Sequence, residues 1–214
     1  MNFKLNKAKG LVLTSLLIST LSACSYNIST KKAFESIESN AFGPSENMQG
    51  SQAVWINDNN WLLASESQGL VMVNSQNQQS KNIAKGSFEA LSISALNNST
   101  YLLATIDNDQ DNVVIFKLQQ ANNSWNIKEL TRISPPQAQP DTVCLFNNKN
   151  NNTVSAFVPD VRGLITETVI YDTSNNETTN VSMREFAGVS EAAGCAVSEQ
   201  SNTLFVSEGE VGIW

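Results

Sequence analysis

The chain has 214 residues and a formal net charge of −7, with 20 acidic residues, 13 basic residues and no histidine. This balance argues against nucleic acid or an anionic lipid surface as a partner, because both repel an acidic protein. The missing histidine excludes acid–base and metal chemistry by imidazole. Hydrophobic residues make up 41% of the chain, which is enough for a folded core.

Residues 1–23 predict a signal peptide. Lys4, Lys7 and Lys9 precede an apolar run over residues 11–21, which is too short to span a bilayer. Leu21-Ser-Ala-Cys24 resembles a bacterial lipobox, in which Cys24 is the lipid-attached first residue of the mature protein. An ordinary secretory signal with an incidental cysteine is the alternative. Because two or three acyl chains anchor a protein stably, we expect a membrane-anchored lipoprotein that is periplasmic or exposed at the cell surface.

Residues 24–50 predict a tether between this anchor and a folded body. They are rich in Ser, Asn, Lys and Glu, contain Gly43-Pro44 and have few large apolar side chains. The folded body then occupies residues 51–214.

Short apolar and β-branched runs alternate with polar turns throughout the body, as expected for antiparallel strands. Comparable runs at Val54, Leu91, Val143 and Cys195 recur at intervals of about 40–50 residues, which is typical of propeller blades. The predicted fold is an all-β propeller of four-stranded antiparallel blades, with about four blades and a last blade that lacks its outer strand. A β-sandwich is the alternative. The expected strands are 53–56, 61–65, 70–73, 81–85, 90–94, 101–105, 113–118, 125–130, 143–146, 154–158, 167–171, 181–186, 195–197, 204–206 and 211–214.

Cys144 and Cys195 occupy like positions in successive repeats. A disulfide requires Cα atoms within about 7 Å, and equivalent strands of neighbouring blades are expected to lie farther apart. Buried free thiols are therefore the favoured expectation, with a disulfide as the alternative. Trp55, Trp61 and Trp125 lie in or beside predicted strands and are expected to pack between blades rather than to bind a ligand.

The last thirty residues carry a family resemblance. Arg184-Glu-Phe186, Gly194-Cys195, Leu204-Phe-Val206 and Glu208-x-x-Val-Gly-Ile-Trp214 resemble the signature of the β-propeller phytases. Weaker matches lie upstream, at 53–56 with 69–70, at 143–145 and at 156–163, so the resemblance covers residues 51–214. It implies six blades and calcium-dependent hydrolysis of inositol hexakisphosphate, a 3-phytase activity. It also implies that the chain is a partial copy, with further blades or a catalytic domain downstream of Trp214.

The resemblance also indicates that the phosphate-binding residues are depleted. The family's first acidic pair aligns with Gly50 and Ser51, and the basic residues after its second strand align with Ser67 and Gln68, leaving Glu66 as the nearby carboxylate. Ser87 stands where the family has an arginine. Later, Val161 replaces a lysine, and Ala193 replaces a glutamate with Glu191 two residues away. We therefore expect a domain that folds like a phytase and does not hydrolyse phytate by itself.

Two acidic segments are candidate calcium ligands. Glu208 and Glu210, with Asp160 from the preceding repeat, are the metal-site candidates, calcium being the metal that the family implies. A solvated turn is the alternative, because hard cations need six or more oxygens from several segments. The loop 107–112 has alternating carboxylates like a calcium loop, but it lacks the glycine and the final glutamate, which favours a polar hairpin loop.

Three functions remain open at this point. The first is an auxiliary phytase-like domain that assists a catalytic domain and binds inositol phosphate or calcium weakly. The second is an active calcium-dependent phosphatase completed by further blades. The third is a non-enzymatic surface propeller that serves as a platform for protein interactions. Whether the chain is an enzyme is left open, and no catalytic residue is assigned.

Overall fold

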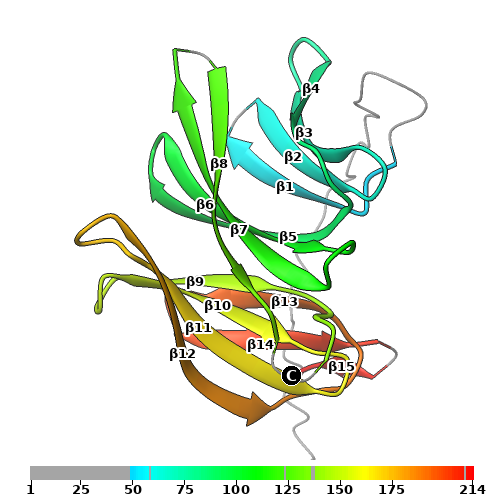
Figure 1. Ribbon diagram of the computed structural model, residues 1–214, viewed down its shortest axis with the longest axis vertical. Helices are drawn as coiled ribbons and strands as arrows, with labels where there is room; N and C mark the ends of the chain where they lie inside the picture. The colour runs from blue at the N-terminus through cyan, green and yellow to red at the C-terminus, as the bar shows by residue number, and fades with distance from the viewer. Residues whose placement is uncertain (1–48, 58, 123, 136–137, 210) are drawn as a thin grey trace, which may run out of the picture. The chain divides into compact units, whose positions relative to one another are not determined.

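The computed structural model describes residues 49–57, 59–122, 124–135, 138–209 and 211–214 (Figure 1). The predicted signal peptide, Cys24 and nearly all of the tether lie outside these residues. The described chain is entirely β-structure, arranged as a propeller of four blades. Within it there is no helix of the length and apolarity that crossing a membrane requires.

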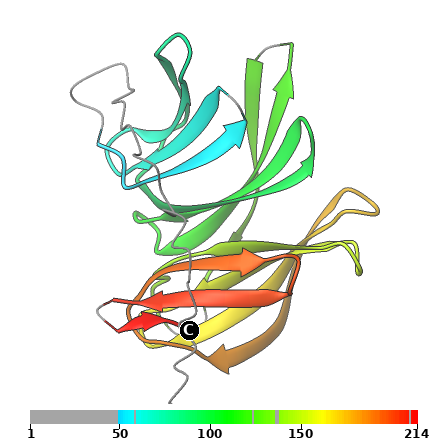
Figure 2. The ribbon, with the colours of Figure 1, turned by 180° about the vertical axis from the view of Figure 1, so that it is seen from behind.

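Each blade is an antiparallel meander whose strands pair in chain order. The first three blades have four strands and the fourth has three, as predicted. Blade 1 contains β1 (Gln52–Asn57), β2 (Asn60–Ser65), β3 (Gly69–Asn74) and β4 (Gln79–Ala84). Blade 2 contains β5 (Phe88–Asn97), β6 (Thr100–Asp107), β7 (Asn112–Ala121) and β8 (Ser124–Ile133). Blade 3 contains β9 (Cys144–Asn148), β10 (Thr153–Pro159), β11 (Leu164–Asp172) and β12 (Glu177–Ala187). Blade 4, red in Figure 2, contains β13 (Ala192–Ser198), β14 (Thr203–Glu208) and β15 (Gly212–Ile213).

The core consists of three apolar layers, one between each pair of successive blades. In blade 1, the alternating residues Leu62 and Ala64 are fully buried against blade 2. In blade 2, every residue of β6 is buried, because this strand has a blade on each side. The outer strands β4 and β12 are mostly exposed and polar, so their backbone pairing, rather than apolar burial, holds them to the sheet.

Asparagine closes many of the hairpin turns. Asn122, Asn152, Asn176 and Asn202 have φ between 51° and 58°, in the left-handed region. Asparagine tolerates this conformation better than most residues with a Cβ. The asparagine-rich loops of the sequence therefore follow from turn geometry.

The expectation that Cys144 and Cys195 are free thiols is wrong. They form a disulfide between β9 and β13, with Cα atoms 5.9 Å apart. Both strands are the first and innermost of their blades, and they pack against each other. Successive blades converge at these innermost strands, which brings equivalent residues within bonding distance. The expectation that Trp55 packs between blades is also wrong, because this residue is 54% exposed.

Candidate functional site

The two ends of the strands differ in chemistry. The end at which each innermost strand begins, here called the carboxylate end, carries most of the acidic residues that the structure describes. The opposite end, called the amide end, is formed by the hairpin turns near residues 57–60, 74–79, 97–100, 121–124, 148–153, 172–177 and 198–203, which are rich in Asn, Gln and Ser. The described acidic residues of the carboxylate end are Glu66, Glu89, Asp107, Asp109, Asp111, Asp141, Asp160, Glu191 and Glu208.

Four of these carboxylates, from three blades, lie close enough to interact. Asp141 precedes β9, and its Oδ2 accepts a hydrogen bond of 2.9 Å from the backbone N–H of Ala192 in blade 4. Burial raises the pKa of the Asp141 carboxyl above its ordinary value, and the negative charges of Asp160, Glu191 and Glu89 raise it further, while the Ala192 hydrogen bond opposes them. Asp141 thus lies among three other carboxylates at this end of the propeller.

Asp160, a metal-site candidate, has a structural role. It is buried, and its Oδ1 accepts hydrogen bonds of 2.9 Å from the backbone N–H groups of Arg162 and Leu164. These bonds close the turn between β10 and β11, in which Gly163 has φ of +84°. One carboxylate oxygen of Asp160 is therefore engaged by the backbone of the turn.

Glu208, the second candidate, accepts a hydrogen bond of 3.0 Å from the indole N–H of Trp214 across blade 4. Glu210 lies outside the described residues. Among the residues that are described, no three or more Asp, Glu, Cys or His side chains form a group able to hold a metal ion. Calcium needs six or more oxygens, so Asp160 and Glu208 by themselves would not complete its coordination.

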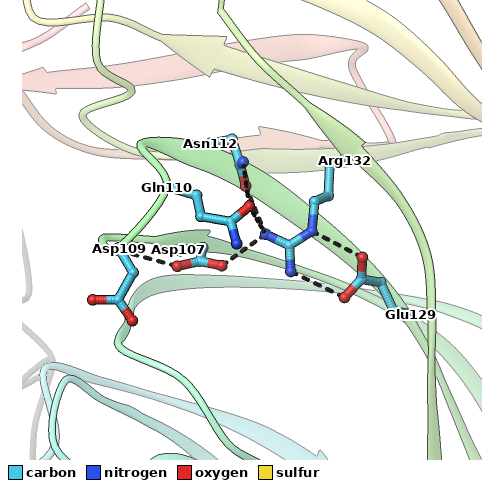
Figure 3. Close-up of polar contacts among 6 residues, drawn as sticks. All are labelled: Asp107, Asp109, Gln110, Asn112, Glu129 and Arg132. Carbon is cyan, nitrogen blue, oxygen red and sulfur yellow. Dashed lines mark hydrogen bonds and ion pairs between the residues drawn. The ribbon is translucent and has the colours of Figure 1, made fainter.

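A guanidinium occupies the centre of the loop that resembles a calcium loop (Figure 3). Arg132 Nη1 on β8 donates to Asp107 Oδ2 at 2.7 Å, Gln110 Oε1 at 3.0 Å and Asn112 Oδ1 at 3.2 Å. Its other nitrogens donate to both oxygens of Glu129, at 2.8 and 3.0 Å. These contacts, led by the bond to Glu129 and then that to Asp107, raise the Arg132 pKa, so the residue stays charged. The loop is a polar hairpin, as favoured from the sequence, and the positive charge that its oxygens contact is the guanidinium of Arg132.

Blade 3 holds a second arginine in an ion pair. Arg184 Nε on β12 lies 2.6 Å from Glu167 Oε2 on β11, and its guanidinium stacks over the Phe186 ring. Arg132 and Arg184 are therefore both engaged by carboxylates of their own blades. Neither could be assigned from the sequence, because their partners are set by cross-strand register.

Five positions that the phytase resemblance singles out lie in one cleft, whereas Gln68, Val161 and Ala193, which it also singles out, do not line it. Gly50, Ser51, Glu66, Ser67 and Ser87 line a cleft of about 480 Å³ together with Gln49, at the carboxylate end of blade 1. We call it the blade 1 cleft. The chain brings these residues together from the entry to β1, the β2–β3 turn and the β4–β5 connection.

The blade 1 cleft is polar and has little charge. The Ser51 hydroxyl lies 3.3 Å from the carbonyl oxygens of Ala64 and Phe88, so it ties the entry of β1 to blade 2. Ser67 Oγ lies 3.4 Å from Ser65 Oγ. Glu66 is the only ionisable group among the residues that line the cleft. Because none of these lining residues is cationic, they cannot form an ion pair with a phosphate group.

Comparisons with known proteins bear on the fold. A scan against protein-family models found no match, and a search of curated proteins found none. The crystal structure of the major Malassezia sympodialis allergen Mala s 1 is similar, at 10% identity over 77% of this chain, with a TM-score of 0.52. This chain covers 58% of the allergen's length, and a similarity at this identity concerns the fold alone. The WD40 β-propeller domain of Doa1 also matches, at 7% identity over 75% of this chain and 76% of that one, but its TM-score of 0.32 supports no inference.

Proposed function

We propose that this chain is a phytase-like β-propeller domain of a membrane-anchored lipoprotein, and that it assists phosphate-ester chemistry without hydrolysing phytate itself. One observation supports the proposal. Five positions chosen from the family resemblance alone, Gly50, Ser51, Glu66, Ser67 and Ser87, line a single cleft. They lie on the entry to β1, the β2–β3 turn and the β4–β5 connection, which the meander places at the same end of blade 1.

The composition of that cleft supports the auxiliary role. Hydrolysis of a phosphomonoester requires cationic groups on the phosphate oxygens and an activated water as nucleophile. Serines at positions 67 and 87 can donate single neutral hydrogen bonds, which are about half as strong as charge-assisted ones. The cleft is therefore suited to weak binding of a phosphorylated ligand rather than to turnover.

Phosphate release from inositol hexakisphosphate, with and without calcium, tests the auxiliary role. We expect no release above background by the full chain. Release that depends on Glu66 would contradict the proposal, since a working site would then exist in the cleft described as depleted.

Restoring the cations tests the resemblance separately. The double variant Ser67→Lys and Ser87→Arg is expected to bind inositol hexakisphosphate at least about ten-fold more tightly than the wild type, because two charge-assisted contacts are added. The matched control, Ser99→Lys with Ser201→Arg, adds the same charge at the amide end. Equal gains in the two double variants would mean that only net charge matters, and the phytase assignment of the cleft would be rejected.

The anchor and the metal remain separate predictions. Labelling with a palmitate analogue is expected to modify the wild-type chain and not Cys24→Ser, and an unlabelled wild type would remove the lipoprotein assignment. Calcium dependence rests on the resemblance alone. Calorimetric titration with calcium tests it, and we assign no ligand beyond Asp160, Glu208 and Glu210.

A platform for protein interactions is the second candidate. Blade 4 exposes four large apolar side chains. They are Phe205, Val211, Ile213 and Trp214. Single exposed apolar residues are common on protein surfaces, but several on one blade are typical of an interaction site. A pull-down from intact cells that depends on Phe205 and Ile213 would favour this function, whereas capture unchanged in Phe205→Ser with Ile213→Ser would count against it.

A further inference from the structure

The largest of the clefts described in the chain lies between blades 1 and 2, near the amide end. Its volume is about 860 Å³, within the range of small-molecule sites. One wall comes from β2, β3 and β4 and the other from β7 and β8. We call it the amide cleft. It is separate from the blade 1 cleft, and the phytase resemblance assigns none of its residues.

The blade 1 wall is a row of three amides. Asn60, Asn74 and Gln79 are direct cross-strand partners on β2, β3 and β4, so their side chains share one face of the sheet. Asn74 Nδ2 donates to Asn60 Oδ1 at 3.3 Å, and Asn60 Nδ2 donates to Asn57 Oδ1 at 2.7 Å. These bonds fix the orientation of the amides before any ligand arrives.

The blade 2 wall is an indole beside an amide. Trp125 on β8 is the direct cross-strand partner of Gln120 on β7, and both line the cleft. The Trp125 ring packs against Tyr101, with centroids 6.0 Å apart, and is only partly buried. The indole is therefore held in place from the core side, and the rest of its surface is available to the cleft.

The polar groups of the cleft are nearly all neutral. Among the lining residues that the structure describes, only Lys81 is ionisable. The side-chain amides of Asn59, Gln78 and Gln120 have no hydrogen-bond partner among the described residues, so each offers two N–H donors and a carbonyl acceptor. A ligand that buries these groups must supply both donors and acceptors, because an unmatched polar group is costly to desolvate.

We propose that the amide cleft binds a neutral oligosaccharide. Each sugar hydroxyl is a donor and an acceptor, which matches the two functions of an amide. The C–H face of a pyranose ring is apolar and flat, which suits the partly buried Trp125 ring and the neighbouring Met72 and Ile83. In the described lining an anionic ligand would meet Lys81 and no second cation, on a chain of net charge −7.

The full chain is titrated with three neutral hexasaccharides, cellohexaose, maltohexaose and chitohexaose, and with the anionic hexamer of galacturonic acid. Binding is followed by calorimetry and by tryptophan fluorescence, which a sugar stacked on Trp125 would change. We expect at least one neutral hexamer to bind and the anionic hexamer to bind more weakly. The proposal is overturned if no neutral hexamer binds below about 10 mM, or if the anionic hexamer binds best.

Variants locate the site. Trp125→Ala is expected to weaken binding about ten-fold or more, and Trp125→Phe to retain most of it, because a smaller ring still stacks. Gln120→Met keeps the shape but removes the hydrogen bonds, and should weaken binding several-fold even if Trp125→Ala does not fold. The matched controls Trp55→Ala and Asn150→Ala remove an exposed indole and an exposed turn amide outside the cleft. If the control variants lose as much sugar affinity as the cleft variants, the sugar binds elsewhere and the proposal is rejected. Neither result depends on phytate binding.

Discussion

Cys144 of β9 and Cys195 of β13 are joined by a disulfide that links two successive blades at their innermost strands. The bond closes a loop with a sequence separation of 51 residues, which contains most of blade 3. Cys144 is also the cross-strand partner of Phe157, which belongs to the apolar layer between blades 3 and 4. The disulfide therefore fastens the layer that the three-stranded blade 4 covers.

Removing the disulfide is expected to destabilise the protein. Cys144→Ser with Cys195→Ser should lower the free energy of unfolding by about 2–4 kcal/mol, because a long loop is no longer closed in the unfolded chain. Urea unfolding of the variant and of the wild type, the latter with and without reductant, measures the difference. The reduced wild type should resemble the variant. An unchanged midpoint in both would show that the bond contributes nothing to stability.

Arg132 is expected to be the most sensitive arginine of the chain. Arg132→Met leaves the buried Asp107 carboxylate without its charged partner and should cost about 2 kcal/mol in unfolding free energy. Arg132→Lys should recover little of this, since an ammonium cannot bridge Glu129 and the loop oxygens together. Lys128→Met, on the same strand and exposed, is the control. Equal losses in Arg132→Met and Lys128→Met would contradict the role of the network.

Ionisation of the Asp141 carboxyl is expected to make the folded protein less stable as the pH rises. Its pKa is raised above 3.8 in the folded protein, so the folded state binds this proton more tightly than the unfolded state. The favourable contribution is complete in acid and is lost as the pH rises through the folded pKa. Asp141→Asn keeps an acceptor for the Ala192 N–H but carries no charge. Relative to the wild type, it should gain stability above pH 3.8 and match it in stronger acid.

Asp172→Asn is the control for this pH dependence. The Ser174 hydroxyl and backbone N–H lower the Asp172 pKa, so its contribution has the opposite sign and is lost as the pH falls. Urea midpoints from about pH 3 to 7 compare the two variants. Parallel curves for Asp141→Asn and the wild type would contradict the assignment of a raised pKa to Asp141.

Gly69 is expected to tolerate no side chain. Its φ is +81°, and a Cβ there would lie 2.1 Å from the carbonyl oxygen of Ala84. Gly69→Ala should therefore cost more than about 2 kcal/mol through backbone strain and the displacement of β4. Gly209→Ala, where a Cβ meets nothing within 4 Å, should be nearly neutral. Thermal unfolding of the two variants decides whether the close approach of β3 and β4 is required.

The apolar pattern of the sequence predicted the buried strands, and it predicted the bounds of the polar, exposed strands less accurately. The run 101–105 lies inside β6, all of which is buried, and the run 113–118 lies inside β7. In contrast, β12 begins at Glu177 rather than at residue 181, since its first residues are polar and exposed. Their strand conformation comes from backbone pairing with β11, which leaves no periodic apolar pattern to read.

The candidate sites, too, were predictable only where they depend on local sequence signals. Five positions singled out by the resemblance line the blade 1 cleft, because the turns at one end of a meander lie side by side and can be located from local signals. The Arg132 network and the Trp125–Gln120 pair depend on cross-strand register, and the disulfide depends on how closely successive blades converge. A one-residue slip in a strand reverses which face a side chain occupies, so these contacts could not be derived from spacing.

The separation of carboxylates from amides along the strands gives the domain two ends that respond differently to solution conditions. Salt weakens the attraction of cations to the carboxylate end and leaves hydrogen bonding at the amide end almost unchanged. Sugar binding at the amide cleft should therefore change little with ionic strength, whereas any binding of ions at the carboxylate end should change with it.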